Sequence, residues 1–319
     1  MATIRDIARL TGHSISTVSR AINHSGYVAP ETKAKIMAAV KKLDYRPNHI
    51  ARELSSGRTH RIGLILPSAN HPFFHRLVNS ISAAALSAGY EVVLLPTNYN
   101  RHVEVDRLEE LRAHAFDGLI FTSRSNSFDF IMQYADYGPI VCCENTRHYP
   151  LSCAYKNREN SFQKTFQRLK AKGYRKIGVT VSRNEYVSAS AQATIRAYQR
   201  VFGLPLKDEL LFRDALTPFD GATAAGEFLA AEPGLEAILA NSDEIAAGVY
   251  QYCQHHQRQL TLIGQDNELI SQLLNFSTID NHLNDIGSIA FSLLFEKEVK
   301  KVLVPATFIE RHLPSLHQA

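Results

Sequence analysis

Residues 14–23 of the chain read Ser-Ile-Ser-Thr-Val-Ser-Arg-Ala-Ile-Asn. Val18 and Ile22 are about one helical turn apart, which predicts a short helix that buries this pair of side chains. Ser14 stands where a hydroxyl can cap the first turn of that helix. The opposite face then presents four side chains to solvent: Ile15, Ser16, Arg20 and Asn23.

A second short helix is predicted directly ahead of this stretch, over residues 3–10. Thr3 and Asp6 have the spacing of an N-terminal capping box, and Gly12 is expected to end the helix. The apolar residues of this helix are predicted to form one stripe: Ile4, Ile7, Ala8 and Leu10. Two short helices joined by a turn that contains glycine predict a helix-turn-helix.

The exposed face of the second helix has the chemistry of DNA recognition. Arginine pairs with the O6 and N7 atoms of guanine, and asparagine pairs with N6 and N7 of adenine. An ordinary helical hairpin with a solvated face is the alternative. The distribution of charge favours the DNA-binding interpretation. Residues 1–61 hold eleven Lys and Arg against four Asp and Glu, whereas the rest of the chain holds 24 Lys and Arg against 27 Asp and Glu.

A third helix is predicted to begin after Pro30 and to close a small core with the first two. Residues 48–57 then predict one or two helical turns, which are too few to be stable alone. Leu54 has no apolar neighbour there, so this segment is either a wedge that opens a DNA minor groove or an ordinary linker.

The sequence of residues 3–57 resembles the DNA-binding head and hinge of the lactose-repressor (LacI/GalR) family of bacterial transcription regulators. The shared motifs are Thr-Ile-Arg-Asp-Ile-Ala at 3–8, Ser-Thr-Val-Ser-Arg at 16–20, Tyr-Arg-Pro-Asn at 45–48 and Ala-Arg-Glu-Leu at 51–54. The resemblance implies base-reading positions at Ile15, Ser16 and Arg20 and a wedge at Leu54. We add Thr3, Thr17 and Asn23 to the expected DNA contacts.

From residue 61 onward, apolar runs that predict strands, the first at 62–66, alternate with amphipathic stretches that predict helices, the first near 73–88. The rhythm restarts near residue 176. This βαβ pattern predicts parallel sheets covered by helices, arranged as two lobes with a ligand cleft at the carboxyl ends of the strands. The fold class is therefore α/β: a small all-α helix-turn-helix head and a two-lobed body like that of periplasmic binding proteins. We expect a head at residues 1–47, a hinge at 48–60 and an effector-binding and dimerisation domain at 61–319.

Four residues of the body are the candidates for effector binding: Ser68, Phe73, Glu144 and Asp266. Phe73 and Asp266 match family motifs, and a carboxylate beside an aromatic ring is typical of a sugar site. Phe74 is expected in the core, and Asp243 is expected to cap a helix.

The family pattern is broken at two positions of the expected cleft. The arginine that relatives use to hold a sugar hydroxyl or an acid aligns with Thr194, which favours a neutral sugar; Arg183 or Arg196 could replace it. Lys156 stands where relatives carry an aspartate, so this part of the chain has gained a positive charge.

The resemblance also implies the partners, which are an inverted-repeat operator in double-stranded DNA, a small-molecule effector and a second copy of the chain. No enzyme motif, cofactor motif or metal-ligand spacing is present, so no enzyme, cofactor or metal site is predicted. The four cysteines are expected to be buried thiols. Without an apolar membrane span or a signal peptide, we expect a cytoplasmic protein associated with the bacterial nucleoid.

Overall fold

The computed structural model describes residues 2–23, 25–46, 53, 57–68 and 72–316. The chain divides into two compact units, residues 1–59 and residues 60–319. Leu54, the expected wedge, lies outside the described residues.

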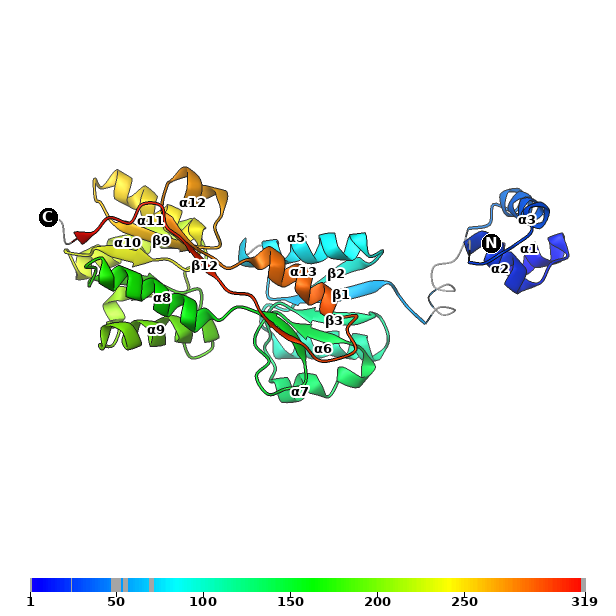
Figure 1. Ribbon diagram of the computed structural model, residues 1–319, viewed down its shortest axis with the longest axis horizontal. Helices are drawn as coiled ribbons and strands as arrows, with labels where there is room; N and C mark the ends of the chain where they lie inside the picture. Colours follow the sequence, from blue (N-terminus) through cyan, green and yellow to red (C-terminus); the bar gives the residue numbers. More distant parts are fainter. Residues whose placement is uncertain (1, 24, 47–52, 54–56, 69–71, 317–319) are drawn as a thin grey trace. The chain divides into compact units, whose positions relative to one another are not determined.

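The first unit packs three helices around a small apolar core (Figure 1). The helices are α1 (Ile4–Thr11), α2 (Ile15–Asn23) and α3 (Pro30–Lys42). Their fully buried side chains are Ile7, Val18 and Ile36, with Ala21 and Ala39 also buried. The predicted capping box is present at Thr3 and Asp6, and Gly12 ends α1 in the left-handed conformation.

The predicted apolar stripe of α1 was wrong at one position. Leu10 is 48% exposed, and the buried side chain of the last turn is Thr11. Thr11 follows Ile7 by four residues and therefore lies on the same face. Its hydroxyl donates to the Ile7 carbonyl at 2.8 Å, which satisfies the polar group inside the core. On α2, Ala21 is more deeply buried than the expected Ile22, which packs at the edge of the core.

The second unit contains two six-stranded sheets, one in each lobe. The first sheet has the order β11-β5-β4-β3-β1-β2, and the second has the order β12-β10-β9-β8-β6-β7. Strand pairs are parallel except for β10 with β12. The strands are β1 (Arg61–Leu66), β2 (Glu91–Pro96), β3 (Gly118–Phe121), β4 (Ile140–Cys142), β5 (Ser152–Tyr155), β6 (Ile177–Thr180), β7 (Leu211–Phe212), β8 (Ala237–Leu239), β9 (Thr261–Gln265), β10 (Ser277–Asp280), β11 (Lys301–Leu303) and β12 (Thr307–Ile309).

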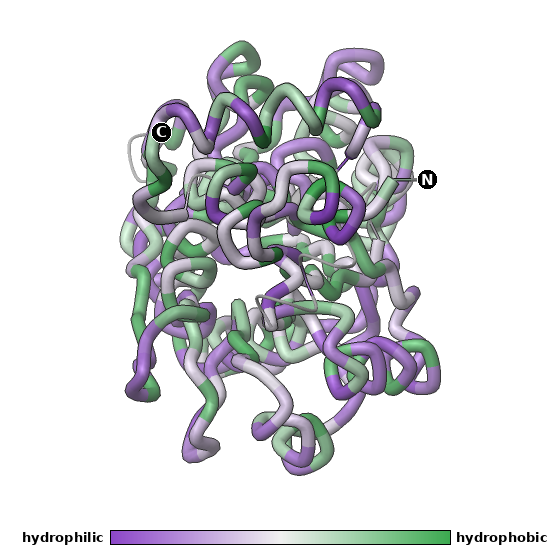
Figure 2. The backbone as a smooth tube through the Cα atoms, turned by 90° about the vertical axis from the view of Figure 1, so that its right-hand side faces the viewer, coloured by the Kyte–Doolittle hydropathy of each residue, from purple (hydrophilic) through white to green (hydrophobic). Residues whose placement is uncertain are grey.

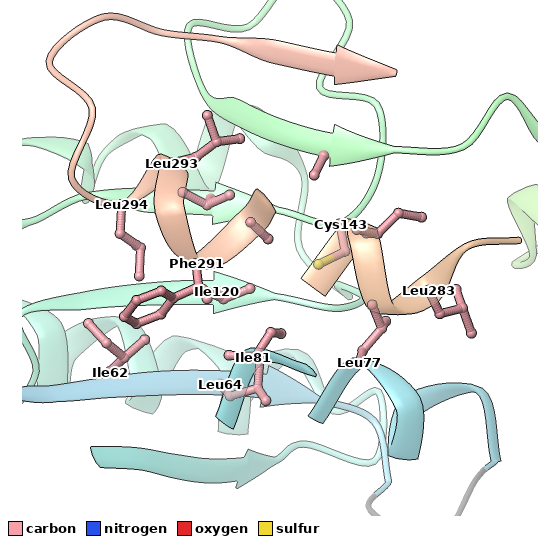
Figure 3. Packing of buried hydrophobic residues seen from close by; sticks show 14 of the residues in the cluster. Ile62, Leu64, Leu77, Ile81, Ile120, Cys143, Leu283, Phe291, Leu293 and Leu294 are labelled. Atoms are coloured by element: carbon pink, nitrogen blue, oxygen red, sulfur yellow. The ribbon is translucent and has the colours of Figure 1, made fainter. Parts of the chain in front are cut away.

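Helices cover both faces of the first sheet. Helices α5 (Pro72–Ser87) and α13 (Leu283–Leu293) lie on one face, and α6 (Arg101–Arg112) and α7 (Phe128–Met132) lie on the other (Figure 1). Figure 3 shows the core under the first pair, where Leu77 and Ile81 of α5 and Phe291 of α13 meet strand residues such as Leu64. A short 3₁₀ turn, η1 (Ala135–Tyr137), precedes β4.

The second sheet is covered in the same way, which confirms the predicted α/β architecture. Helices α8 (Arg158–Ala171) and α9 (Ala189–Phe202) pack against one face, and α10 (Pro218–Ala231) and α11 (Asp243–His255) pack against the other. The remaining elements are η2 (Asp208–Leu210) and α12 (Leu269–Leu273). In Figure 2, hydrophilic and hydrophobic residues alternate along the helices, as expected for helices with one buried face.

The chain passes between the lobes at three places, which are residues 156–157, 281–282 and 304–306. Consequently α13 and β11 belong to the first lobe although they follow most of the second lobe in sequence. No helix in the described part of the chain is long and apolar enough to cross a membrane. All four cysteines are buried free thiols, as predicted.

Candidate functional site

Helix α2 presents a polar face with one apolar side chain. Ile15 is 47% exposed, and Ser16, Arg20 and Asn23 are exposed as well. The helix is held against α1 and α3 by Val18 and Ala21 on its other side. The Ser14 hydroxyl accepts from the Thr17 backbone N–H at 3.1 Å, so the predicted cap of α2 is present.

Two other candidate DNA contacts lie near the helix starts. Thr3 is exposed, and its hydroxyl donates to the Asp6 carboxylate at 2.7 Å. Thr17 is half-buried, with its hydroxyl 2.8 Å from that of Ser14. Both hydroxyls therefore already have partners, and so does the Asn23 amide, which donates to the Ser19 hydroxyl at 3.2 Å. Arg20 is the longest side chain of the outer face.

The second unit contains a cavity of about 680 Å³ that residues of both lobes line. Its first-lobe wall comes from segments that follow β1 to β4, and its second-lobe wall from segments that follow β6, β8 and β9. These are the carboxyl ends of parallel strands, where a ligand site is expected in a sheet of this kind. Ser68, Glu144 and Asp266 lie on the wall, so three of the four candidates share one cavity. The side chain of Phe73 lies outside the described residues.

Asp266 is the most deeply buried of these candidates, at 4% exposure. It adopts the left-handed conformation with a φ of 88°, which is uncommon for a residue other than glycine. Its backbone N–H donates to Ile279 at 2.8 Å, and its carboxylate accepts from Asn281 Nδ2 at 2.6 Å. Asn281 lies in the second crossover, so the carboxylate is anchored to a segment that joins the lobes.

Glu144 forms an ion pair that the sequence did not reveal. Its Oε1 lies 3.1 Å from Nε of Arg124, which follows β3. The Arg124 guanidinium also stacks on the Phe128 ring, 3.8 Å from the ring centre. Phe74 is 7% exposed and belongs to the core, as expected, although its edge borders the cavity.

Arg183 and Arg196, which could each take over the role of the arginine that relatives carry at position 194, lie in different places. Thr194 is buried on the cavity wall and donates to the Ser190 carbonyl at 3.0 Å. Arg183 lies on the cavity wall and stacks on Tyr99 of the first lobe, 3.7 Å from the ring centre. Arg196 instead bonds to Glu159 at the surface. Arg183 is thus the arginine placed to contact a ligand.

Asp243 does not cap a helix, contrary to the sequence expectation. Ser242 caps α11 by accepting from the Ile245 N–H at 3.2 Å. Asp243 is completely buried, and its carboxylate accepts from the Thr278 hydroxyl and the Glu268 N–H, each at 2.6 Å. Burial raises the pKa of this carboxyl to about 6 against the effect of these bonds. Asp243 therefore ties the loop after β9 to α11.

Lys156 and Arg158 also line the cavity, although they were not among the four candidates. They flank the first crossover, where the chain leaves β5 and begins α8. Burial lowers the pKa of Lys156 to about 7, with the Asp266 charge acting in the opposite direction. The change of charge at Lys156 was visible in the sequence, but its approach to Asp266 was not. Among the described residues, no cluster of three or more His, Cys, Asp or Glu side chains is arranged to hold a metal ion.

Both units of the chain match family models that name the LacI family. Residues 3–48 match the model of the bacterial regulatory proteins of the lacI family, and residues 59–300 match that of periplasmic binding proteins and the sugar-binding domain of the LacI family. The chain is 39% identical to catabolite control protein B of Bacillus subtilis (strain 168) over 308 residues, which cover 97% of this chain and 99% of that protein.

Solved structures share the fold at lower identity. A lac repressor dimer bound to operator and the anti-inducer ONPF is 19% identical, with a TM-score of 0.82 over 97% of this chain and 98% of that chain. A LacI-family regulator from Lactobacillus casei with bound glucose is 18% identical, with a TM-score of 0.71 over 79% and 98%. The chain belongs to the LacI family, and it is a DNA-binding transcription regulator with an effector-binding domain rather than an enzyme.

Proposed function

We propose that this regulator represses a carbohydrate-use operon and that a sugar bound between its lobes controls it. The observation that carries this proposal is the cavity that both lobes line, with the buried carboxylate of Asp266 on its wall. A carboxylate accepts two hydrogen bonds from neighbouring sugar hydroxyls, and a relative of the same fold is described with bound glucose.

The DNA site is proposed to be the outer face of α2, with Ile15, Ser16, Arg20 and Asn23 reading bases. One such helix contacts few base pairs, which is too little discrimination against the competing sites of a genome. We therefore propose a homodimer on an inverted-repeat operator. A lac repressor with the same fold is described as a dimer bound to operator, which supports the dimer. Its action on the operator would take place in the bacterial cytoplasm.

Residues 48–60 are proposed to be the hinge between head and body, with Leu54 as the minor-groove wedge. Two hinges held side by side would stabilise each other's short helix, because one alone has no core. Their spacing depends on the arrangement of the first lobes in the dimer. An effector between the lobes changes operator affinity only if it binds two lobe arrangements with different affinities.

The test is a comparison of wild type with Asp266→Ala. Operator fragments would be selected from random DNA, and affinity would be measured by fluorescence anisotropy with and without a panel of sugars and sugar derivatives. We expect the variant to bind the operator as wild type does and to lose its response to the active compound. Asp136→Ala, which removes an exposed carboxylate outside the cavity, is the control and should respond normally. A full response of Asp266→Ala at unchanged effector concentration would contradict the role of Asp266.

A further inference from the structure

The cavity wall carries more positive charge than a site for a neutral sugar requires. Four cationic side chains line it, and three carboxylates accompany them. Arg124 and Glu144 form an ion pair at 3.1 Å and so largely neutralise each other. The remaining charged wall residues are three cations and two carboxylates: Lys156, Arg158, Arg183, Asp214 and Asp266.

Lys156 and Arg158 occupy one short stretch of this wall. Each is half-buried, and they are separated by a single residue at the start of α8. The positive charge of Arg158 lowers the pKa of Lys156, as does burial, which is the larger effect. Two cations that repel each other in a partly buried place are unfavourable by themselves, and an anion between them removes the repulsion.

Asp266 is the carboxylate of the cavity wall whose charge acts on Lys156. Asp266 raises the pKa of Lys156, but less than burial lowers it. The Asp266 carboxylate also accepts from Asn281 at 2.6 Å, which holds it toward the second crossover. Asp214 lies on the wall too, in an exposed position where solvent screens its charge.

The start of α9 adds to the positive potential. Its first residues, Ala189 and Ser190, line the cavity, and α9 runs for 14 residues. The positive end of the helix dipole is therefore directed at the cavity and favours a negative group there. The helix dipole of α9 thus favours an anion in the cavity, as Lys156 and Arg158 do.

We propose that the effector carries an anionic group, a phosphate or a carboxylate, which Lys156 and Arg158 bind while Asp266 accepts from hydroxyl groups of the same molecule. This inference rests on the proposed function and narrows its ligand class to acidic sugar derivatives. It replaces the expectation of a neutral sugar, which rested on the absence of an arginine at Thr194. The proposed cationic partners lie at the first crossover and the start of α8, rather than at position 194 on α9.

The experiment uses the full chain and matched sets of glucose, galactose and mannose, the 6-phosphate of each and the uronic acid of each, with inorganic phosphate as a further probe. Binding would be measured by thermal shift and then by calorimetry. We expect an acidic member to bind at least about tenfold more tightly than its neutral parent, since a charge-assisted hydrogen bond contributes an effect of this size. Whether the phosphate or the uronate binds identifies the anionic group, and competition by inorganic phosphate would support a phosphate.

Three variants connect the result to the proposed residues. Lys156→Met and Arg158→Met should each weaken binding of the acidic member about tenfold or more, and Lys156→Arg should stay within about threefold of wild type. The unfolding midpoint without ligand shows that each variant is folded. The inference is overturned if a neutral sugar binds as tightly as its acidic counterparts, if no acidic member binds, or if Lys156→Met leaves the affinity for the acidic member unchanged.

The same samples separate this inference from the proposed function. An acidic sugar that binds without altering operator affinity would support the anion site and contradict the regulatory role of the cavity. A neutral sugar that binds alone and alters operator affinity would support the regulatory role and overturn the anion site.

Discussion

Arg20 extends from the outer face of α2, where no core contact holds its guanidinium. The backbone around it is fixed, because Val18 and Ala21 on the inner face are completely or almost completely buried. A long donor on a rigid helix can approach a base edge without losing backbone entropy, and arginine is suited to guanine. We therefore expect Arg20 to read bases rather than to contribute to folding.

Replacing Arg20 by alanine should cost about 1–3 kcal/mol per half-site and relax base preference there. Lys33→Ala is the comparison, because a lysine that contacts phosphate should weaken binding to all sequences equally and lower the salt dependence. Competition between operator and random DNA at two salt concentrations distinguishes the two effects. Equal losses on both kinds of DNA for Arg20→Ala would contradict its base-reading role.

Lys156 predicts how the binding of an acidic effector depends on pH. Its pKa is lowered to about 7, so the side chain loses its charge as the pH rises from 6 to 8. A bound anion favours the charged form, and binding is therefore coupled to proton uptake. The charged groups that face Lys156 are Asp266 and Arg158, and those of the wider wall are Arg124, Glu144, Arg183 and Asp214.

For a uronic acid, whose own charge is constant in this range, the affinity should fall by up to about tenfold between pH 6 and pH 8. Calorimetry at several pH values measures this fall. Lys156→Arg should show a much flatter profile because arginine stays protonated. A wild-type profile as flat as that of Lys156→Arg would contradict the assignment.

At the scale of residues, the sequence predicted side chains by type but not always by role. Ser242 and Asp243 are adjacent and either can cap a helix, so sequence spacing cannot separate them. Ser242 caps the helix because the Asp243 carboxylate is engaged elsewhere in the fold, where it accepts from the Thr278 hydroxyl and the Glu268 N–H. The buried position of Asp243 also requires glycine at position 264, because a Cβ there would lie 2.0 Å from Asp243 Oδ1.

At the scale of elements, segments with a clear apolar run were predicted well, and segments without one were missed. The strand at 62–66 and the helix near 73–88 correspond to β1 and α5, since both have clear periodicity. Strand β5 reads Ser-Cys-Ala-Tyr and has no strong apolar run, and β11 and β12 have only three residues each. The return of α13 to the first lobe is a matter of topology that local sequence does not encode.

Helices α10 and α11 are in close backbone contact through two glycines. A Cβ on Gly221 would lie 2.2 Å from the Ile245 carbonyl oxygen, and one on Gly248 would lie 1.8 Å from the Pro218 carbonyl oxygen. The atoms in the way belong to the backbone, so no change of rotamer can relieve the clash. An added methyl group must move one helix away from the other and disturb the core between them.

We therefore expect Gly248→Ala to destabilise the second unit by about 3 kcal/mol or more, measured by urea unfolding. Gly226→Ala is a matched control in α10. Its Cβ would be 3.3 Å from the Tyr252 ring, a side chain that can shift, and alanine favours helix by about 1 kcal/mol. Similar destabilisation by both substitutions would show that the close approach of the backbones is not the cause.

At the scale of the whole body, the cavity combines residues that are far apart in sequence. Ser68 and Asp266 are separated by about two thirds of the chain, and three crossovers bring their lobes together. The rule that ligands bind at the carboxyl ends of parallel strands predicted the location of the cavity. It did not predict the Arg124–Glu144 pair or the stacking of Arg183 on Tyr99, because these depend on how one lobe faces the other.

A second contact between the lobes is the hydrogen bond from Arg76 Nη2 on α5 to the Asn267 carbonyl at 3.1 Å. The Asn267 side chain is fixed inside the second lobe, since it accepts from Arg311 at 2.7 Å and donates to Asp280 at 3.0 Å. Arg76 therefore holds the first lobe to a rigid point beside Asp266. The bond exists only in lobe arrangements that keep this distance, so we expect it to bias the equilibrium on which the proposed effector acts.

Replacing Arg76 by alanine should shift that equilibrium by about 1–2 kcal/mol, and so change both operator and effector affinity by up to about thirtyfold. Because linkage is reciprocal, the two affinities must change in opposite directions if the effector releases DNA, and in the same direction if it promotes DNA binding. Anisotropy for operator and calorimetry for effector measure the two changes. The control is His75→Ala, which alters the neighbouring exposed residue of α5 and should leave both affinities as in wild type. If Arg76→Ala also left both unchanged, the bond to Asn267 would play no part in the switch, and the coupling would have to pass through the crossovers or through other contacts between the lobes, such as Arg183 on Tyr99.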